Sequence, residues 1–380
     1  MSQRSIQAEK LGILGGGQLG RMLIQSALDL NLNIKILDPD ENAPCSKIAG
    51  EFVHGKLTDY DTVYAFGKDC DVITVEIENV NVEALQTLKQ EGKRVYPQPE
   101  VIALIQDKRT QKQFYKDKNI PTADFVLTED LEDVRKYQDF LPAVNKLGKE
   151  GYDGKGVQIL RTAADIDKAF NSKGLLEKLI DFEKEIAVIV SRNEAGEINY
   201  FPAVELVFHP EANLVEYLFA PADIDDSIAE QAYAIAEKVI SELGMVGLLA
   251  VEMFVTRDGQ VLVNEVAPRP HNSGHQTIEA NFTSQYEQHL RSILGLPLGS
   301  TEAIMPSAMV NLLGEDGYTG EARYEGLHEV MAQKGVHVHL YGKKYTKPFR
   351  KMGHVTIVDE NVLMLREKVN FVKQTLKVIA

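Results

Sequence analysis

The pattern of apolar and polar residues in the N-terminal part of the chain alternates between two periods. Short continuous apolar runs are typical of buried parallel strands, and apolar residues at helical spacing are typical of amphipathic helices. The strands predicted in this way cover residues 10–14, 33–37, 71–76 and 94–96, and the helices cover residues 21–30 and 82–90. Strands that alternate with helices in this order predict a doubly wound α/β domain.

The pattern changes after this domain and predicts two more. A polar amphipathic helix over residues 108–118 precedes a compact unit over 120–185 with a glycine-rich centre, and another helix is expected over 227–243. Short strands and a basic stretch follow from residue 307 onward. The expected domains therefore cover residues 1–107, 108–305 (with the unit over 120–185 as a small lid subdomain) and 306–380.

A glycine-rich turn joins the first predicted strand to the first helix. Gly15, Gly17 and Gly20 match the GxGxxG spacing of a dinucleotide-binding turn, and Asp38 lies where such a site places an acidic residue. Glycine lets backbone N–H groups approach a phosphate at the start of a helix. The turn therefore fits an NAD site, a site for another phosphorylated ligand that Gln18 reads, or a turn needed only for packing.

A second glycine-rich segment, KLGKEGYDGKGV, covers residues 146–157 between two predicted strands, 143–147 and 157–160. Its four glycines within nine residues favour a loop whose amides fold over phosphates. The spacing is not that of a Walker A loop, and Lys146 on the incoming strand is a candidate point charge for nucleotide phosphates. A flexible hairpin tip with solvated lysines is the alternative that the pattern leaves open.

Two carboxylates are predicted to face one another across a hairpin. Asp258-Gly259, between two apolar runs, is a strong signal for a two-residue turn, and that register places Glu252 opposite Glu265. Two carboxylates held together between apolar neighbours require a shared proton or a cation, and Mg²⁺ takes oxygen ligands together with substrate phosphates. The alternatives are a solvated face for both glutamates, or a β-bulge that breaks the pairing.

The charge of the chain limits its ligands. The 380 residues carry 41 basic and 56 acidic side chains, a formal net charge of −15. This balance disfavours nucleic acid polymers and anionic membranes, because affinity for both comes from clustered cations. Six cations and no acidic residue lie within residues 334–351, which indicates either a solvated face or a phosphate clamp.

Cellular location is expected to be the cytoplasm. The N-terminal residues lack the apolar core of a signal peptide, and the longest apolar run, over residues 245–255, is too short to span a bilayer and contains Glu252. The two cysteines, Cys45 and Cys70, are not spaced as a CxxC motif and are expected to be reduced.

Six segments in order resemble one family of ATP-grasp enzymes. They are GGGQLGRM (15–22), DVITVEIENV (71–80), QDKRTQK (106–112), GYDGKG (151–156), EVAPRPHNSGH (265–275) and YGKKYTKPFRKMGH (341–354). Together they are similar to the N5-carboxyaminoimidazole ribonucleotide synthetase family of purine biosynthesis, and HNSGH and RKMGH are the most specific of them. The resemblance covers almost the whole chain. It implies an α/β protein with an N-terminal Rossmann-like parallel-sheet domain, a central ATP-grasp domain with a glycine-rich lid, a small β-rich C-terminal domain, and a homodimer.

The resemblance also implies a reaction and the residues that perform it. ATP and bicarbonate would carboxylate 5-aminoimidazole ribonucleotide through carboxyphosphate, with release of ADP and phosphate. ATP would be surrounded by Lys108, Lys146, Gly151, Tyr152, Asp153, Gly154, Lys155, Gly156, Val157, Glu177, Lys178, Leu179, Ile180, Glu185, His209, Asn264 and Glu265. Mg²⁺ would be bound by Glu252 and Glu265. Catalysis would involve Tyr152, Asp153, Lys155 and Arg269. The substrates would be bound by these four residues together with Gln18, Glu78, Lys343 and Arg350, which contact the ribonucleotide.

Two positions depart from the family pattern. Lys108 replaces an arginine that contacts ATP, which keeps the charge but loses bidentate geometry. Glu150 replaces a glycine of the lid, which bears on lid mobility and ATP affinity.

Three other functions compete with this one. They are a formate-dependent glycinamide ribonucleotide transformylase of the same superfamily, an NAD-dependent oxidoreductase that uses the first glycine turn, and a nucleotide-binding module without catalysis. The oxidoreductase leaves the facing glutamates and the second glycine-rich loop unexplained, and the HNSGH and RKMGH segments argue against the transformylase. A noncatalytic module is disfavoured because the chain has all four of the expected catalytic and metal-binding residues, Glu252, Glu265, Asp153 and Arg269.

Overall fold

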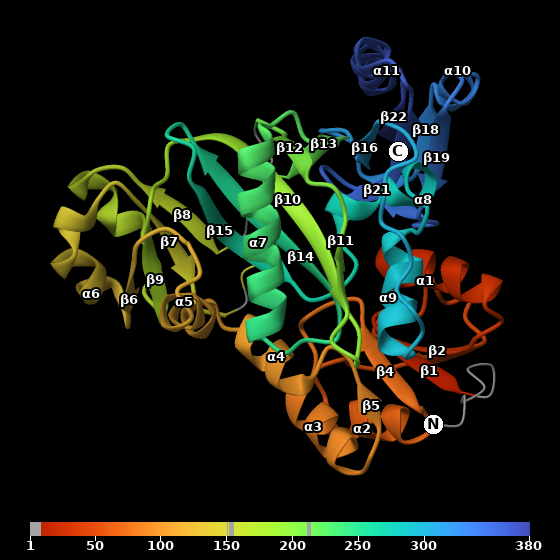
Figure 1. Cartoon of the computed structure of the whole chain (residues 1–380), viewed down its shortest axis with the longest axis horizontal. Helices are drawn as coiled ribbons and strands as arrows, with labels where there is room; N and C mark the ends of the chain where they lie inside the picture. Colours follow the sequence, from red (N-terminus) through yellow and green to blue (C-terminus); the bar gives the residue numbers. More distant parts are fainter. Residues whose placement is uncertain (1–8, 150, 152–155, 211–213) are drawn as a thin grey trace.

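The computed structural model describes residues 9–149, 151, 156–210 and 214–380. Figure 1 shows a central sheet with the long helix α7 in front of it, an α/β layer below, a small sheet to one side and the C-terminal segment above. Within the described residues no helix is long and apolar enough to cross a membrane. Cys45 and Cys70 are both buried free thiols.

The N-terminal part is a five-stranded parallel sheet in the order β3-β2-β1-β4-β5. Its strands are β1 (Lys10–Leu14), β2 (Asn33–Asp38), β3 (Glu51–His54), β4 (Val72–Val75) and β5 (Arg94–Val95), and its helices are α1 (Gln18–Asp29), α2 (Tyr60–Lys68), α3 (Val82–Gln90) and α4 (Pro99–Ile105). Helices α2, α3 and α4 pack on one face. Helix α1 packs on the other face together with α9 (Gln285–Ile293), so the central part of the chain completes the core of this domain.

The small sheet at the side of Figure 1 has four antiparallel strands in the order β6-β9-β7-β8. The strands are β6 (Phe125–Thr128), β7 (Ala143–Leu147), β8 (Val157–Leu160) and β9 (Gly174–Lys178), covered by α6 (Leu131–Lys136) and short 3₁₀ turns. Helix α5 (Lys108–Asp117) leads into this sheet and is capped by Asp107, whose carboxylate accepts the N–H groups of Arg109 and Thr110.

The largest sheet has nine strands, with β11 (Ile198–Tyr200) beside the path β15-β14-β10-β12-β13-β16-β21-β19. The other strands are β10 (Phe182–Arg192), β12 (Val204–Phe208), β13 (Val215–Ala220), β14 (Gly247–Thr256), β15 (Val261–Ala267), β16 (Ser307–Leu313), β19 (Val336–Leu340) and β21 (Lys351–Val358). Helix α7 (Asp226–Glu242) buries its apolar side against β10, β14 and β15. Because β13 pairs with β16, the C-terminal strands extend the central sheet.

The C-terminal segment adds its own small core to this extension. Two short antiparallel pairs join β17 (Gly320–Glu321) to β20 (Tyr345–Thr346) and β18 (Arg323–Glu325) to β22 (Lys377–Ile379). Its helices are α10 (Leu327–Met331) and α11 (Val362–Thr375), and the short helix α8 (Thr277–Ala280) lies earlier in the chain. The apolar side of α11 packs on β16 and β21.

Local pattern predicted most N-terminal elements correctly. The strand over residues 10–14, the helix over 82–90 and the strands over 143–147 and 157–160 have the predicted bounds, and other predicted elements are shifted by one to three residues. Helices α2, α4 and α9 were not predicted.

Candidate functional site

The two facing glutamates lie on β14 and β15 at the edge of the large sheet. Glu252 is paired with Glu265, as predicted. The predicted two-residue turn is wrong: Thr256 donates its N–H to the carbonyl of Gln260, at 2.9 Å, and Gly259 takes a φ of 79°. Such a three-residue loop shifts the whole register by one residue, so Val255 pairs with Val261.

A β-bulge restores the pairing. The register shifts between Glu252 and Met253, because Met253 pairs with Val263 and leaves Asn264 as the extra residue of β15. The bulge that was expected to break the pair is therefore what creates it. It also directs Asn264 to the small sheet, where its side-chain oxygen accepts a hydrogen bond from Lys146 at 3.1 Å.

The carboxyl groups of this pair have opposite electrostatic surroundings. Lys108 lies 3.0 Å from Glu265 and lowers the pKa of that carboxyl to about 2, with a smaller contribution from Lys146. Burial raises the pKa of Glu252 well above its usual value, and the charge of Glu265 adds to the shift. His271 lies 3.5 Å from Glu252 on the other side.

These two carboxylates fit a hard divalent cation. Glu252 is buried while 48 % of the Glu265 side chain is exposed, so a cation between them could also contact a bound phosphate.

A buried ion cluster lies where the small sheet meets the large one. Glu177 of β9 pairs with Lys112 of α5 at 2.7 Å and with Lys146 of β7 at 2.9 Å. The two lysines lower the pKa of Glu177 in spite of its burial, whereas burial lowers the pKa of Lys112 to about 8. Lys112 also contacts Thr122, which donates to the carbonyl of Val263 at 2.7 Å. The cluster therefore joins both sheets, and Lys112 was not among the predicted site residues.

The hinge (residues 177–180) connects β9 of the small sheet to β10 of the large sheet. Lys178 donates its backbone N–H to Asp124 at 2.8 Å, and Leu179 donates to Pro142 at 3.2 Å. The Lys178 side chain turns to Phe140, over whose ring its ammonium lies. Since the Glu177 and Lys178 side chains and the N–H groups of Lys178 and Leu179 have partners within the protein, the hinge has only its remaining backbone groups to offer a ligand.

Glu185 of β10 lies between the hinge and the glutamate pair. Its carboxylate is 3.5 Å from the side-chain nitrogen of Asn264. Burial raises the pKa of Glu185 to about 7, and the negative charge of Glu265 adds to the shift. The structure thus gathers Lys108, Lys146, Glu185, Asn264 and the glutamate pair around one region between the sheets.

Part of the predicted lid lies outside the described residues. Glu150, Tyr152, Asp153, Gly154 and Lys155 belong to that part. Gly151, Gly156 and Val157 are described: Val157 begins β8 opposite Lys146, and Gly156 takes a φ of 79° while its carbonyl accepts the N–H of Leu147.

The glycine turn at the start of α1 is closed by carboxylates. Glu76 accepts the N–H groups of Gly17 and Gly20, each at 2.6 Å, and Asp38 accepts that of Gly16 at 2.6 Å. A pyrophosphate would have to displace these carboxylates, and their negative charge would oppose it. This arrangement contradicts the dinucleotide interpretation. Sequence reasoning missed Glu76, although it ends a predicted buried strand and lies in a segment, 71–80, that carries the family resemblance.

Arg269 connects the N-terminal domain to the central domain. Its guanidinium lies 2.9 Å from the carboxylate of Glu78, just beyond β4. Gln18 is the first residue of α1. The structure therefore places Arg269 and Glu78 together, at the border between the N-terminal and central domains.

The basic stretch (residues 334–351) belongs to the C-terminal segment. Lys343 donates to the carbonyl of Lys351 at 2.7 Å, and Arg350 donates to that of Tyr345 at 2.6 Å. His209, predicted to contact ATP, follows β12 and lies against the ring of Phe349 in this stretch.

The last residues of the two most specific motifs pack together. His275 of HNSGH lies with its ring 4.6 Å from that of His354 of RKMGH, and His339 stacks on the other side of His354 at 4.4 Å. Burial lowers the pKa of His275 and of His354 well below the usual value, so both rings are neutral. These two histidines join the central and C-terminal parts of the chain.

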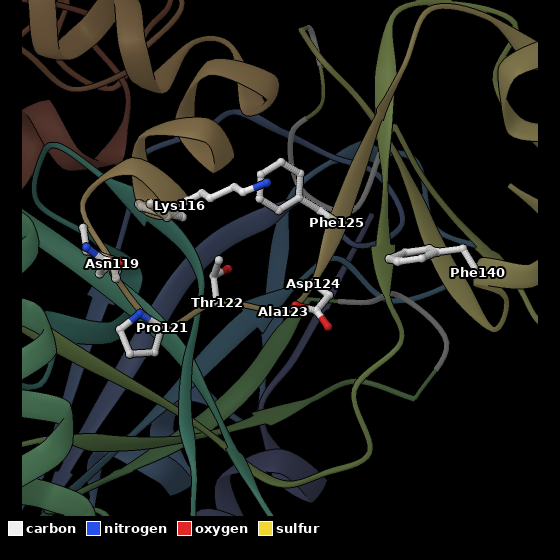
Figure 2. A pocket seen from close by; sticks show the side chains of 10 residues that line it. Lys116, Asn119, Pro121, Thr122, Ala123, Asp124, Phe125 and Phe140 are labelled. Carbon is white, nitrogen blue, oxygen red and sulfur yellow. The ribbon is translucent and has the colours of Figure 1, made fainter.

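A cavity of about 560 Å³ lies on the linker between α5 and β6 (Figure 2). Its lining includes Lys116, Asn119, Asp124, Phe125 and Phe140. None of the predicted site residues is among the described residues that line it. Its lining does include Thr122 of the ion cluster, and Asp124 and Phe140, which contact Lys178 of the hinge.

Three family models match the chain in order. They are the ribonucleotide synthetase preATP-grasp domain over residues 8–106, the ATP-grasp domain over 113–286, and the phosphoribosylaminoimidazole carboxylase C-terminal domain over 307–368.

Curated proteins and solved structures agree with these models. N5-carboxyaminoimidazole ribonucleotide synthase of Bacillus subtilis is 37% identical over 92% of this chain and 91% of its own. The chain is similar to the crystal structure of N5-carboxyaminoimidazole ribonucleotide synthetase from Thermotoga maritima, with a TM-score of 0.91, 43% identity, and coverage of 98% of this chain and 99% of that one. The Aspergillus clavatus N5-carboxyaminoimidazole synthase in complex with ADP and 5-aminoimidazole ribonucleotide gives a TM-score of 0.88 at 31% identity, and covers 97% of this chain and 98% of that one. The chain therefore belongs to the N5-carboxyaminoimidazole ribonucleotide synthetase family of ATP-grasp enzymes.

Proposed function

We propose that this protein carboxylates 5-aminoimidazole ribonucleotide to N5-carboxyaminoimidazole ribonucleotide, with ATP and bicarbonate as co-substrates and ADP and phosphate as products. The observation that carries the proposal is the pair Glu252–Glu265 beside Lys108 and Lys146, between the two sheets of an ATP-grasp domain. The Aspergillus relative named as a complex with ADP and the ribonucleotide supports simultaneous binding of a nucleotide and this acceptor.

On the nucleotide side, the hinge backbone reads adenine and Glu185 accepts hydrogen bonds from the ribose hydroxyls. Lys146, Lys108, His209, Asn264 and the lid surround the phosphates, with Mg²⁺ held by Glu252 and Glu265. The bound cation would neutralise phosphate charge. The buried cluster around Glu177 fixes the direction of Lys146 and so positions its charge.

On the acceptor side, Lys343 and Arg350 bind the 5′-phosphate, and Gln18 and Glu78 bind the aminoimidazole ribonucleotide. Tyr152, Asp153 and Lys155 contact bicarbonate and the imidazole. Arg269 stabilises the negative charge that develops during acyl phosphate formation and breakdown. Its pairing with Glu78 supports a position at the border of both substrates.

The chemistry has two displacements. A bicarbonate oxygen attacks the γ-phosphorus of ATP, the bond to the β-phosphate oxygen breaks, and ADP leaves with that electron pair. The exocyclic amine then attacks the carboxyl carbon of carboxyphosphate, the amine loses a proton, and phosphate leaves. The products are the carbamate, ADP, phosphate and the proton released from the amine, so atoms and charge balance.

A coupled assay of ADP release tests this function. We expect release that requires the ribonucleotide, bicarbonate and Mg²⁺ together. Stimulation by formate with glycinamide ribonucleotide instead would favour the transformylase, and a change in nicotinamide absorbance would favour the oxidoreductase. An absence of stimulation by aminoimidazole ribonucleotide would refute the proposal.

The proposal also covers the cellular location, oligomeric state and domain boundaries of the enzyme. We infer a cytoplasmic homodimer with domains over residues 1–107, 108–305 and 306–380, consistent with a biosynthetic enzyme that takes small substrates. Light scattering at several concentrations measures the mass, and a monomer throughout would contradict the dimer.

A further inference from the structure

An unusual turn lies inside the basic stretch. The N–H of Arg350 donates to the carbonyl of Lys347 at 3.0 Å, which closes a four-residue turn with Pro348 and Phe349 at its centre. Phe349 takes a φ of 61°. Because proline cannot take a positive φ, this combination is a type II turn, whose third position favours glycine or asparagine and disfavours a bulky side chain.

The turn is fixed to the end of the large sheet. Phe349 donates its N–H to the carbonyl of Gly314 at 2.8 Å, and Gly314 donates to the carbonyl of Arg350 at 2.9 Å. These two bonds define the direction of the Phe349 side chain. Bulky residues in this backbone region are uncommon and gather at functional sites, where the surrounding structure holds them.

Phe349 does not act as a core residue. Its ring is half-buried, and it belongs to none of the hydrophobic clusters found among the described residues. Instead its ring meets that of His209 edge to face, with centroids 5.5 Å apart and planes at 65°. Edge-to-face pairs at this distance are attractive beyond their buried area.

The two rings come from different parts of the chain. His209 follows β12, where its N–H donates to the carbonyl of Leu214 at 2.8 Å, whereas Phe349 precedes β21. Phe349 is also the direct neighbour of Arg350. The contact therefore links His209, predicted at ATP, to the direct neighbour of Arg350, which is predicted at the ribonucleotide phosphate.

We propose that Phe349 is a positioning residue that holds His209 against the nucleotide and couples the ribonucleotide clamp to the ATP side of the site. The inference rests on the proposed function, since that function places His209 at ATP and Arg350 at the ribonucleotide. A disfavoured turn conformation is retained because the ring it presents orders His209.

Calorimetric titration of the full chain with ATP and Mg²⁺ tests this coupling without turnover. We expect Phe349→Gly to weaken ATP binding about three- to tenfold, the range of an aromatic pair, while its melting temperature stays equal or rises because glycine adopts positive φ readily. His209→Ala should weaken binding similarly, and the double variant should be no weaker than either single variant. Additive losses, or unchanged affinity in Phe349→Gly, would overturn the inference.

Two control variants complete the experiment. Phe349→Tyr keeps the ring and should bind ATP within about twofold of the parent. Asn31→Gly changes another residue with positive φ, 51°, at the end of α1, and should leave ATP affinity unchanged. If the parent chain binds no ATP, the proposed function itself fails; if it binds ATP and Phe349→Gly binds equally well, only the coupling fails.

Discussion

Glu252 and Glu265 are the same residue type, directly paired, yet the protein gives their carboxyl groups opposite proton affinities. Lys108 stabilises the charge on Glu265, and burial disfavours a charge on Glu252. A buried carboxylate paired with an ionised one is an arrangement that an additional positive charge would stabilise. Lys108 stands at the position where the family resemblance expects arginine, and its contact with Glu265 shows that the lysine still reaches the site.

Loss of the charge on Glu265 should abolish turnover. We expect Glu265→Gln to lower kcat by about 100-fold or more, because the amide is a poor ligand for a hard cation and leaves Lys108 without its partner. Steady-state ADP release over a range of Mg²⁺ concentrations measures the effect. Near-parental kcat at ordinary Mg²⁺ would refute the metal role, and Glu287→Gln, on the surface of α9, is a matched control.

Glu185 should make ATP binding depend on pH. Because its pKa is raised to about 7, the carboxyl is protonated below that pH and ionised above it. An ionised carboxylate accepts hydrogen bonds from both ribose hydroxyls, so KM for ATP should fall by up to about tenfold between pH 6 and 8.

The Glu185→Gln variant supplies the comparison. It should bind ATP more weakly, and the ratio of its KM to that of the parent should rise with pH through 7. A constant ratio would contradict the assignment. The same raised pKa means that the Glu185 contribution to folding stability declines as pH rises from 4.5 to about 7, since the folded state binds the proton more tightly.

At the scale of elements, the hairpin β14–β15 shows what sequence pattern can and cannot predict. The two apolar runs around Asp258-Gly259 predicted the hairpin, and the facing pair of Glu252 and Glu265 is confirmed. The turn length was wrong by one residue, and the bulge at Asn264 compensated for it. A bulge depends on packing against β10 and the small sheet, which local pattern does not record.

Contacts between segments that are distant in the sequence were also beyond what local pattern could predict. Glu76 and Lys112 each complete a site with residues more than fifty positions away. Both lie in segments that carry the family resemblance, 71–80 and 106–112, but no local pattern assigned either residue a role. The lysines and glycines of the second loop could be proposed from sequence because their chemistry is local. The resemblance to a family supplied the roles of Arg269 and Arg350, which no local pattern could assign.

The cluster around Glu177 should contribute strongly to folding stability, and Glu177 should contribute more than Lys112. Glu177 and Lys112 are both 3 % exposed, and removal of one partner leaves an uncompensated buried charge. We expect Glu177→Ala to lower the free energy of unfolding by about 3–5 kcal/mol, because two lysines lose their counter-ion.

Lys112→Ala should cost less, because Glu177 keeps Lys146. Urea unfolding of both variants at pH 7 gives the comparison. Equal losses, or a larger loss for Lys112→Ala, would contradict this view of the cluster.

At the scale of the whole molecule, the proposed site lies where the parts of the chain meet. Helix α9 completes the core of the N-terminal sheet, β13 pairs with β16 across the central and C-terminal parts, and His275 packs on His354. A net charge of −15 does not conflict with anionic substrates, since the cations proposed to bind them are few. The acidic surface continues to argue against nucleic acid polymers.

Incorporation of ¹³C-bicarbonate into the ribonucleotide tests the central claim most directly. With ATP, Mg²⁺ and 5-aminoimidazole ribonucleotide, the protein should transfer label to the exocyclic nitrogen as a carbamate, in equal amount to the ADP released. Carbon-13 NMR at alkaline pH detects the carbamate before it decomposes. ADP release without label in the ribonucleotide, or label without ADP, would contradict the account.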